Sequence, residues 1–488
     1  MLTRPRRIGS RALAGIRDPT YRGSYALVIN TAGTTAFGVA YWAVAARLYD
    51  RQLLGRSAAL VSALILVSSL AQLNVGNALP RFLPQAGQSA GRLIAYGYGA
   101  SSAAALAIAT AFVTVAPRLS GQWHFLGRSA ALAAAFVGAA IVWGVFALED
   151  AALTGLRRAT IIPLENTAYG ASKLLLLVVG AALLPSTGIF FSWIVPLAVI
   201  VPAINWLIFR RYLRCSWTAA QASVLRGREV VRFASVDYLG TLLGQACGNL
   251  LPLVILSVLG AAANASFFVA WTIVSGLALV ATNFATSMLV EGAAAPHRLT
   301  ELTRGVLARC ALAVAPGAAV LALAARPILS IYGVGYAAHT SSLLALLAAA
   351  ALPNSFLQVT FTLDRITGRV GRATWSRLAL AVLVLGGGWA LTKHLGVDGA
   401  ALAWGGGNLV VAVARSPAVF SAARGAADPV AAAGAVPGAA AGPAPGAARA
   451  PGDVAGTRGP GQHRRPAVGR HRAGGPPAAH REGARACH

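Results

Sequence analysis

Long runs of uncharged, mainly apolar residues follow one another along the chain between residues 24 and 423. Each run has about the 20 residues that an α-helix needs to cross a bilayer. The clearest predicted membrane helices are 24–46, 57–80, 93–117, 129–148 and 340–363. Residues 238–290 carry no charge over 53 positions, which is enough for two helices joined by the turn LGAAANA.

The remaining runs bring the number of predicted helices to twelve. Residues 163–209 hold two of them, separated by the segment LPSTG at 184–188. Three weaker runs, each with an arginine near one end, are 304–325, 374–392 and 397–423. The pattern therefore predicts an all-α integral membrane protein with about twelve transmembrane helices.

The composition agrees with this fold class. Only 11% of the residues are charged, whereas a soluble domain has about 25%. The net charge of +27 would suit a nucleic-acid partner, but its placement argues against one. With the N-terminus inside, the inner loops hold 22 Lys and Arg residues and the outer loops hold 7. This bias follows the positive-inside rule and predicts a multi-pass protein of the cell membrane with both termini cytoplasmic.

Two short segments occur twice in the same order. LTGLRRATII at 153–162 is matched by ITGRVGRATW at 366–375, and LLGRSAALVSAL at 53–64 by VLGAAANASFFV at 258–269. The matches predict two parallel six-helix repeats around a central cavity, a common transporter plan. The expected lobes are 24–209 and 233–424, with a basic cytoplasmic N-terminus at 1–23 and a basic cytoplasmic linker at 210–232.

The chain carries no sequence motif for covalent chemistry. Walker, HExxH, nucleophile-elbow and DxD patterns do not occur. The acidic pair Glu149 and Asp150 stands near the predicted end of a helix, beside Arg157 and Arg158. We interpret it as a solvated ion pair. We therefore expect no enzymatic activity, and no cofactor or metal.

Four further segments, in their order along the chain, resemble polysaccharide flippases of the multidrug/oligosaccharidyl-lipid/polysaccharide exporter superfamily. They are ARLYDRQLLGRSAAL (46–60), LNVGNALPRFLP (73–84), YGVGYAAHTSSLLALLAAAALP (332–353) and LGVDGAALAWGGG (395–407). The resemblance spans about residues 24–423. It implies alternating-access transport of a polyprenyl-diphosphate-linked oligosaccharide, with membrane lipids and glycan-assembly enzymes as partners, and it is compatible with a monomer.

Two alternatives stay open at this point. A drug/cation antiporter of the same superfamily would need a membrane acid in the first lobe, and the sequence offers none there away from helix ends. A membrane glycosyltransferase or polymerase would need a long extracytoplasmic loop with arginines or acids, and the predicted loops are short.

A diphosphate substrate implies cations in the cavity. Lys173 lies about ten residues into a predicted helix, where an ionisable residue usually faces the bundle interior or water. Arg81 and Arg47 stand at the ends of predicted helices. Binding the headgroup is one role for each of the three; snorkelling or an internal pair is the alternative for Lys173, and interfacial anchoring is the alternative for the arginines.

Polar residues in the helices are the other candidates. The sugar is expected to hydrogen-bond to amides, although helix–helix contacts use the same groups. The candidate amides are Gln72, Asn74, Asn77, Gln245 and Asn249. Asp237 is a candidate for ion coupling, with a nearby cytoplasmic arginine as its alternative partner.

Residues 425–488 differ in kind from the rest. They contain no Leu, Ile, Phe, Trp, Tyr, Met or Lys and are built mainly from Ala, Gly, Pro and Arg. Such a segment cannot bury a core and is expected to be disordered. It is either a basic tail held near anionic headgroups or the product of a shifted reading frame.

The tail gives a first prediction. Truncation after Arg424 should leave membrane insertion and transport unchanged, because no residue beyond it can pack against a membrane helix. Membrane abundance and transport are to be measured together for the truncated and full chains. Loss of transport at unchanged abundance would make the tail a functional element.

Overall fold

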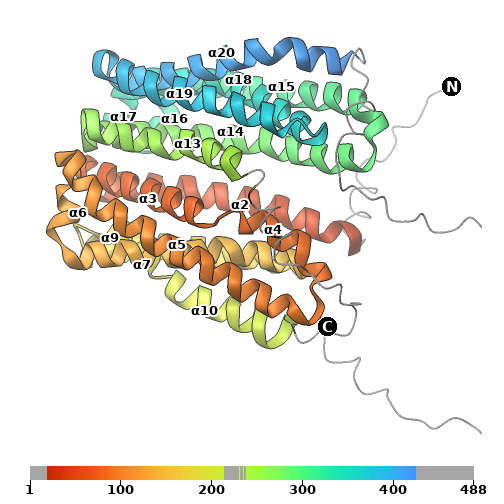
Figure 1. Ribbon diagram of the computed structural model, residues 1–488. Coiled ribbons are helices and arrows are strands. Elements are labelled where there is room, and N and C mark those ends of the chain that lie inside the picture. Colours follow the sequence, from red (N-terminus) through yellow and green to blue (C-terminus); the bar gives the residue numbers. More distant parts are fainter. Residues whose placement is uncertain (1–18, 214–229, 231–234, 236–237, 425–488) are drawn as a thin grey trace, which may run out of the picture. The chain divides into compact units, whose positions relative to one another are not determined.

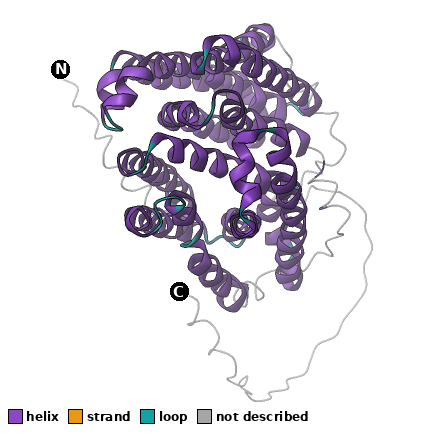
Figure 2. Ribbon diagram, turned by 90° about the vertical axis from the view of Figure 1, so that its left-hand side faces the viewer, coloured by secondary structure: helices purple, strands orange, loops and turns teal. Residues whose placement is uncertain are grey.

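The computed structural model describes residues 19–213, 230, 235 and 238–424. In these ranges the regular structure is helical, with short turns between helices (Figure 2). Residues 1–18, Asp237, most of the expected linker and the tail 425–488 lie outside the described residues. The expected lobe boundaries stay a prediction.

The first half comprises the helices coloured red to yellow in Figure 1. They are α2 (Pro19–Leu48), α3 (Arg51–Ala71), α4 (Val75–Phe82), α5 (Ala90–Leu119), α6 (His124–Arg128), α7 (Ala130–Gly155), α8 (Ile162–Leu183), α9 (Gly188–Ile194) and α10 (Leu197–Leu207). The last of them continues as a π-helical turn to Tyr212.

The second half comprises the helices coloured green to blue in Figure 1. They are α13 (Tyr238–Leu259), α14 (Ala261–Ala294), α15 (Leu299–Leu323), α16 (Ala325–Ser330), α17 (Val334–His339), α18 (Ser341–Ile366), α19 (Val370–Leu395) and α20 (Val397–Ala423).

The predicted fold class is confirmed. Eleven described segments are long and apolar enough to cross a membrane, and α2, with 30 residues, supplies a twelfth long helix. Six of the twelve lie in each half. Helices suit this environment because the bilayer core offers no water, so each backbone N–H and C=O must be satisfied within the segment.

The repeated basic turns form the same helix cap in both halves. The N–H of Arg158 donates to the carbonyl of Leu153 at 2.8 Å, and that of Arg369 donates to Asp364 at 2.8 Å. The residue before each donor is left-handed, with φ of 58° at Arg157 and 71° at Gly368. This is the Schellman arrangement, which satisfies the last carbonyls of a helix. The sequence match aligns Gly155 with Gly368, but the left-handed cap residue of the first half is Arg157. The first cap therefore lies two residues later than the match predicts.

The second predicted membrane helix is broken, which corrects the continuous run 57–80. The α3 helix ends at Ala71, and the backbone is left-handed at Leu73 and Asn74, with φ of 50° and 60°. The α4 helix then begins at Val75. At the break, the hydroxyl of Tyr238 in α13 donates to the carbonyl of Leu70. A side chain from the second half thus satisfies a backbone group at this break.

The halves meet where α3 packs against α13 and α14. The side-chain amide of Asn264, which is fully buried, donates to the carbonyl of Gly55 at 2.8 Å. A Cβ at Gly55 would lie 1.7 Å from the carbonyl oxygen of Ala261. Both sides of this contact come from the second pair of repeated segments, 53–64 and 258–269. Nearby, Arg51 donates to the hydroxyl of Ser266 at 2.6 Å.

The close approach gives the second prediction. Gly55→Ala should lower the thermal unfolding midpoint of the purified protein, because overpacking a tight contact costs about 1–3 kcal/mol. Gly99→Ala is the control, since Gly99 is also helical and a Cβ there meets nothing within 4 Å. The change to Ala favours the helix by about 1 kcal/mol at both sites. Equal midpoints for the two variants would contradict the tight contact.

Candidate functional site

A polar cavity lies where the broken helix of the first half faces α13. It has a volume of about 220 Å³ and is lined by Ser69, Gln72, Asn74, Gly76, Asn77, Tyr238, Thr241 and Gln245. Four of the five amides predicted to bind sugar therefore come together here. The side chain of Asn77 donates to that of Asn74 at 2.6 Å. Because α3 ends at Ala71 and α4 begins at Val75, Gln72, Asn74 and Asn77 lie at or next to the interruption between these helices.

A second cavity adjoins the first. It has a volume of about 380 Å³ and shares Thr241 and Gln245 with the first. Its other polar lining residues come from helices of the second half: Thr282, Asn354, Gln358, Arg365, Arg377 and Trp404. The two cavities together form a polar region that begins between the halves and extends into the second half. We call it the central cavity.

The central cavity contains basic side chains. Arg365 and Arg377 both line it, and the guanidinium of Arg377 lies 4.7 Å from the ring centre of Phe361. The neighbouring amide of Asn354 is fixed by donating to the side chain of Asn408 at 3.1 Å. The region is therefore suited to an anionic group with hydroxyls attached to it.

Neither arginine was predicted as a site residue, because both were counted only among the cytoplasmic Lys and Arg residues that predict the topology. A helical pattern could have found one of them. The residues at 354, 358, 361 and 365 are spaced by four, three and four, which places them on one face of α18, and all four line the cavity. Two amides and an arginine on one face of a membrane helix are such a signal.

Besides Lys173, three predicted residues lie outside the central cavity's lining. The side chain of Asn249 donates to the carbonyl of Gln245 in its own helix at 3.0 Å. Arg81 is exposed, with its guanidinium 5.7 Å from the ring centre of Phe82. Arg47 donates to the carbonyl of Ile331 at 2.7 Å, which ties the two halves together. A substrate contact by any of them stays a prediction.

Lys173 is buried inside the first half, with 7% of the residue exposed. Its ammonium nitrogen lies 4.3 Å from a ring centre of Trp193, 4.9 Å from that of Tyr41 and 5.0 Å from that of Tyr169. Lys173 also lines a separate cavity of about 320 Å³, together with Asp150 and other residues of the first half. It faces the interior of its own half and not the lining of the central cavity.

The interpretation of Glu149 as part of a solvated ion pair is wrong. Glu149 is fully buried and accepts a hydrogen bond from the side chain of Asn205. The reason is that α7 continues past Glu149 to Gly155 and α10, which carries Asn205, packs against it. Glu165 is buried as well. Across the described ranges, no group of three or more His, Cys, Asp or Glu residues is placed to hold a metal ion.

Solved structures of membrane transporters have a similar fold. The "inward-facing conformation of a multidrug resistance MATE family transporter of the MOP superfamily" has a TM-score of 0.59 at 14% identity, over 85% of this chain and 100% of that one. The corresponding outward-facing conformation has a TM-score of 0.59 at 13% identity, over 83% and 96%. MATE in complex with MaD5 has 0.59 at 15% identity, over 84% and 99%.

No family model and no curated protein matches the sequence. The structural likeness establishes the fold, which is the twelve-helix arrangement in two repeats. Two of the similar structures are inward-facing and outward-facing conformations, so this fold occurs in at least two arrangements. Their superfamily is also the one that the sequence segments resemble.

Lys173 gives the third prediction. Lys173→Ala should lower both the membrane abundance and the unfolding midpoint, because it removes a buried stem and a cation that three aromatic rings surround. A desolvated cation–π contact is worth about 2 kcal/mol or more. Lys173→Arg should retain part of the stability, since it keeps the charge. Leu175→Ala, on an exposed position of the same helix, is the control. Loss of transport at normal abundance would instead favour a direct substrate contact.

Proposed function

We propose that the chain is a membrane transporter that moves a polyprenyl-diphosphate-linked oligosaccharide, or a related polysaccharide precursor, across the cell membrane. The observation that carries the proposal is the pair of arginines that line the central cavity, Arg365 and Arg377, among amides. Guanidinium groups bind phosphate oxygens in a bidentate manner. The amides of Gln245 and Gln358 are suited to sugar hydroxyls.

Transport would occur by alternating access of the two halves. In support, the inter-half hydrogen bonds of Arg47, Arg51 and Asn264 lie near the ends of α2, α3 and α14, whereas the break in the first half lies at the far end of α3. The lipid tail would stay in the bilayer while the headgroup passes through the central cavity.

This proposal includes no enzymatic step. The substrate arrives already joined to its lipid, so the protein's task is to provide polar contacts inside the membrane. Glycan-assembly enzymes are the expected partners because they make and consume that substrate. Both termini would be cytoplasmic, as the distribution of Lys and Arg predicts.

A drug/cation antiporter is the second candidate, and one observation favours it. Glu149 and Glu165 are buried in the first half, and Asp150 lines the cavity that holds Lys173. The expectation that the first half offers no acid of this kind was therefore too strict. Two of the similar solved structures are multidrug resistance MATE family transporters. Against this candidate, an organic cation would meet Arg365 and Arg377 in the central cavity.

The fourth prediction tests the anionic substrate. Arg365→Gln and Arg377→Gln should each reduce transport about tenfold or more at unchanged membrane abundance, because each removes a charge-assisted bond to the diphosphate. The measurement is the share of lipid-linked sugar on the cytoplasmic leaflet in cells that rely on the variant. Arg304→Gln is the control, since Arg304 is an exposed arginine that does not line the described cavities.

The outcomes separate the two candidates. Accumulation of lipid-linked sugar on the cytoplasmic leaflet in both cavity variants, but not in the control, supports the first. Normal glycans together with increased drug sensitivity would contradict it and favour the antiporter. For the antiporter, Asp150→Asn would be the variant that abolishes drug resistance.

A further inference from the structure

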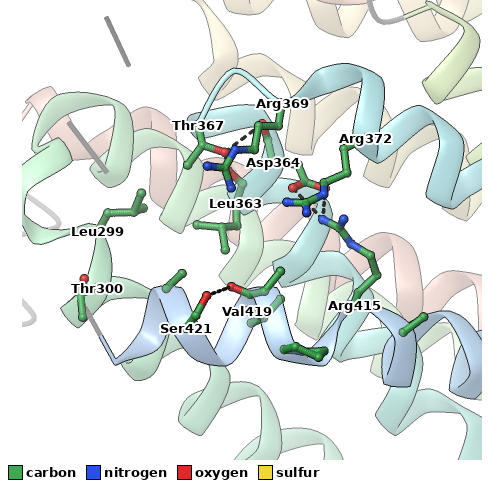
Figure 3. Close-up of a pocket in the computed structure, with 14 residues that line it drawn as sticks. Leu299, Thr300, Leu363, Asp364, Thr367, Arg369, Arg372, Arg415, Val419 and Ser421 are labelled. Carbon is green, nitrogen blue, oxygen red and sulfur yellow. Dashed lines mark hydrogen bonds and ion pairs between the residues drawn. The ribbon is translucent and has the colours of Figure 1, made fainter. Parts of the chain in front are cut away.

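A third cavity lies at one end of the second half (Figure 3). It has a volume of about 480 Å³ and is formed by the beginnings of α15 and α19 and by the final turns of α18 and α20. It shares no lining residue with the central cavity. We call it the end cavity. No part of the transport proposal uses it.

Three arginines surround one carboxylate in the end cavity. The terminal nitrogen Nη2 of Arg415 contacts both oxygens of Asp364, at 2.7 and 2.5 Å. Both side chains are buried, with 11% and 5% exposed. Figure 3 shows Arg372 and Arg415 converging on Asp364, and Arg369 on the loop beside it. The described lining residues thus carry two more positive charges than negative ones.

The bond to Asp364 leaves part of Arg415 without a partner. Within the described part of the chain, its Nε atom is buried and makes no hydrogen bond. A buried donor without an acceptor costs about as much as a lost hydrogen bond. Asp364 holds the guanidinium in place at one edge, and Arg415 lines the cavity in this fixed orientation.

The surroundings of the cavity add further donors and an apolar edge. Thr300, Thr367 and Ser421 line it with hydroxyl groups. On the adjoining part of α20, Leu409 and Val413 are exposed, as expected of a surface that faces lipid. Because four membrane helices begin or end here, the cavity lies where lipid headgroups meet the protein.

We propose that the end cavity binds a phosphate group, carried by an anionic phospholipid or by a soluble phosphate compound. A phosphate offers several acceptor oxygens to the three guanidiniums and the hydroxyls, and its charge balances theirs. Positive charge near a membrane surface attracts anionic lipids in general. That general attraction needs only exposed positive charge. Here Asp364 also fixes the orientation of Arg415 beside a cavity of about 480 Å³, which indicates a specific binding site.

The experiment measures binding rather than transport, so it does not depend on the proposed substrate. The unfolding midpoint of the purified full-length protein is followed against inorganic phosphate at constant ionic strength. A parallel series uses phosphatidylcholine nanodiscs with increasing phosphatidylglycerol. Arg369→Gln and Arg372→Gln are the test variants, because both arginines are exposed and their loss leaves the buried pair of Asp364 and Arg415 intact. Arg304→Gln, which removes the same charge from α15, is the matched control.

We expect a saturable rise in the midpoint of the parent, with half-saturation shifted about tenfold upwards in each test variant and unchanged in the control. A response to phosphatidylglycerol alone would assign the site to a lipid headgroup, and a response to inorganic phosphate alone would assign it to a soluble ligand. No response to either, or an equal shift in Arg304→Gln, would overturn the proposal.

Discussion

The contact between α3 and α14 sets the geometry of the molecule. In a bilayer, helices gain nothing by hiding apolar surface from water, so they associate through close packing and hydrogen bonds. Gly55 meets both needs, since its missing side chain admits the backbone at Ala261 and its carbonyl accepts from Asn264. At the opposite end of α3 the helix is interrupted, Tyr238 of the second half bonds to the carbonyl of Leu70, and the polar wall of the central cavity forms.

Charges buried in the membrane are costly unless something compensates them, and the two halves compensate them differently. The first half surrounds Lys173 with three aromatic rings and buries Glu149 beside the amide of Asn205. The second half pairs Asp364 directly with Arg415. The described lining of the central cavity carries arginines and amides, whereas Glu149 and Asp364 lie outside that lining.

The twelve helices could be predicted because the bilayer fixes both their length and their composition. The repeated turns could also be found, since each helix end needs the same cap. The break at Leu73 could not, because it depends on Tyr238, which is far away in the sequence. Four amides of the central cavity were identified from their polarity alone. The roles of Arg365 and Glu149 were missed, because they depend on which way a helix face turns and on which helix covers it.

Gly55 and Asn264 belong to equivalent helices of the two repeats, so their contact lies close to the axis that relates the halves. In a dimer of two identical six-helix chains, symmetry would produce such a contact twice, with each chain supplying both partners. In the fused chain the glycine occurs in both repeats, as Gly55 and Gly260, whereas the position equivalent to Asn264 is Ala59. Because the two halves of one chain need not be identical, Gly55 is held by an amide that only the second half carries.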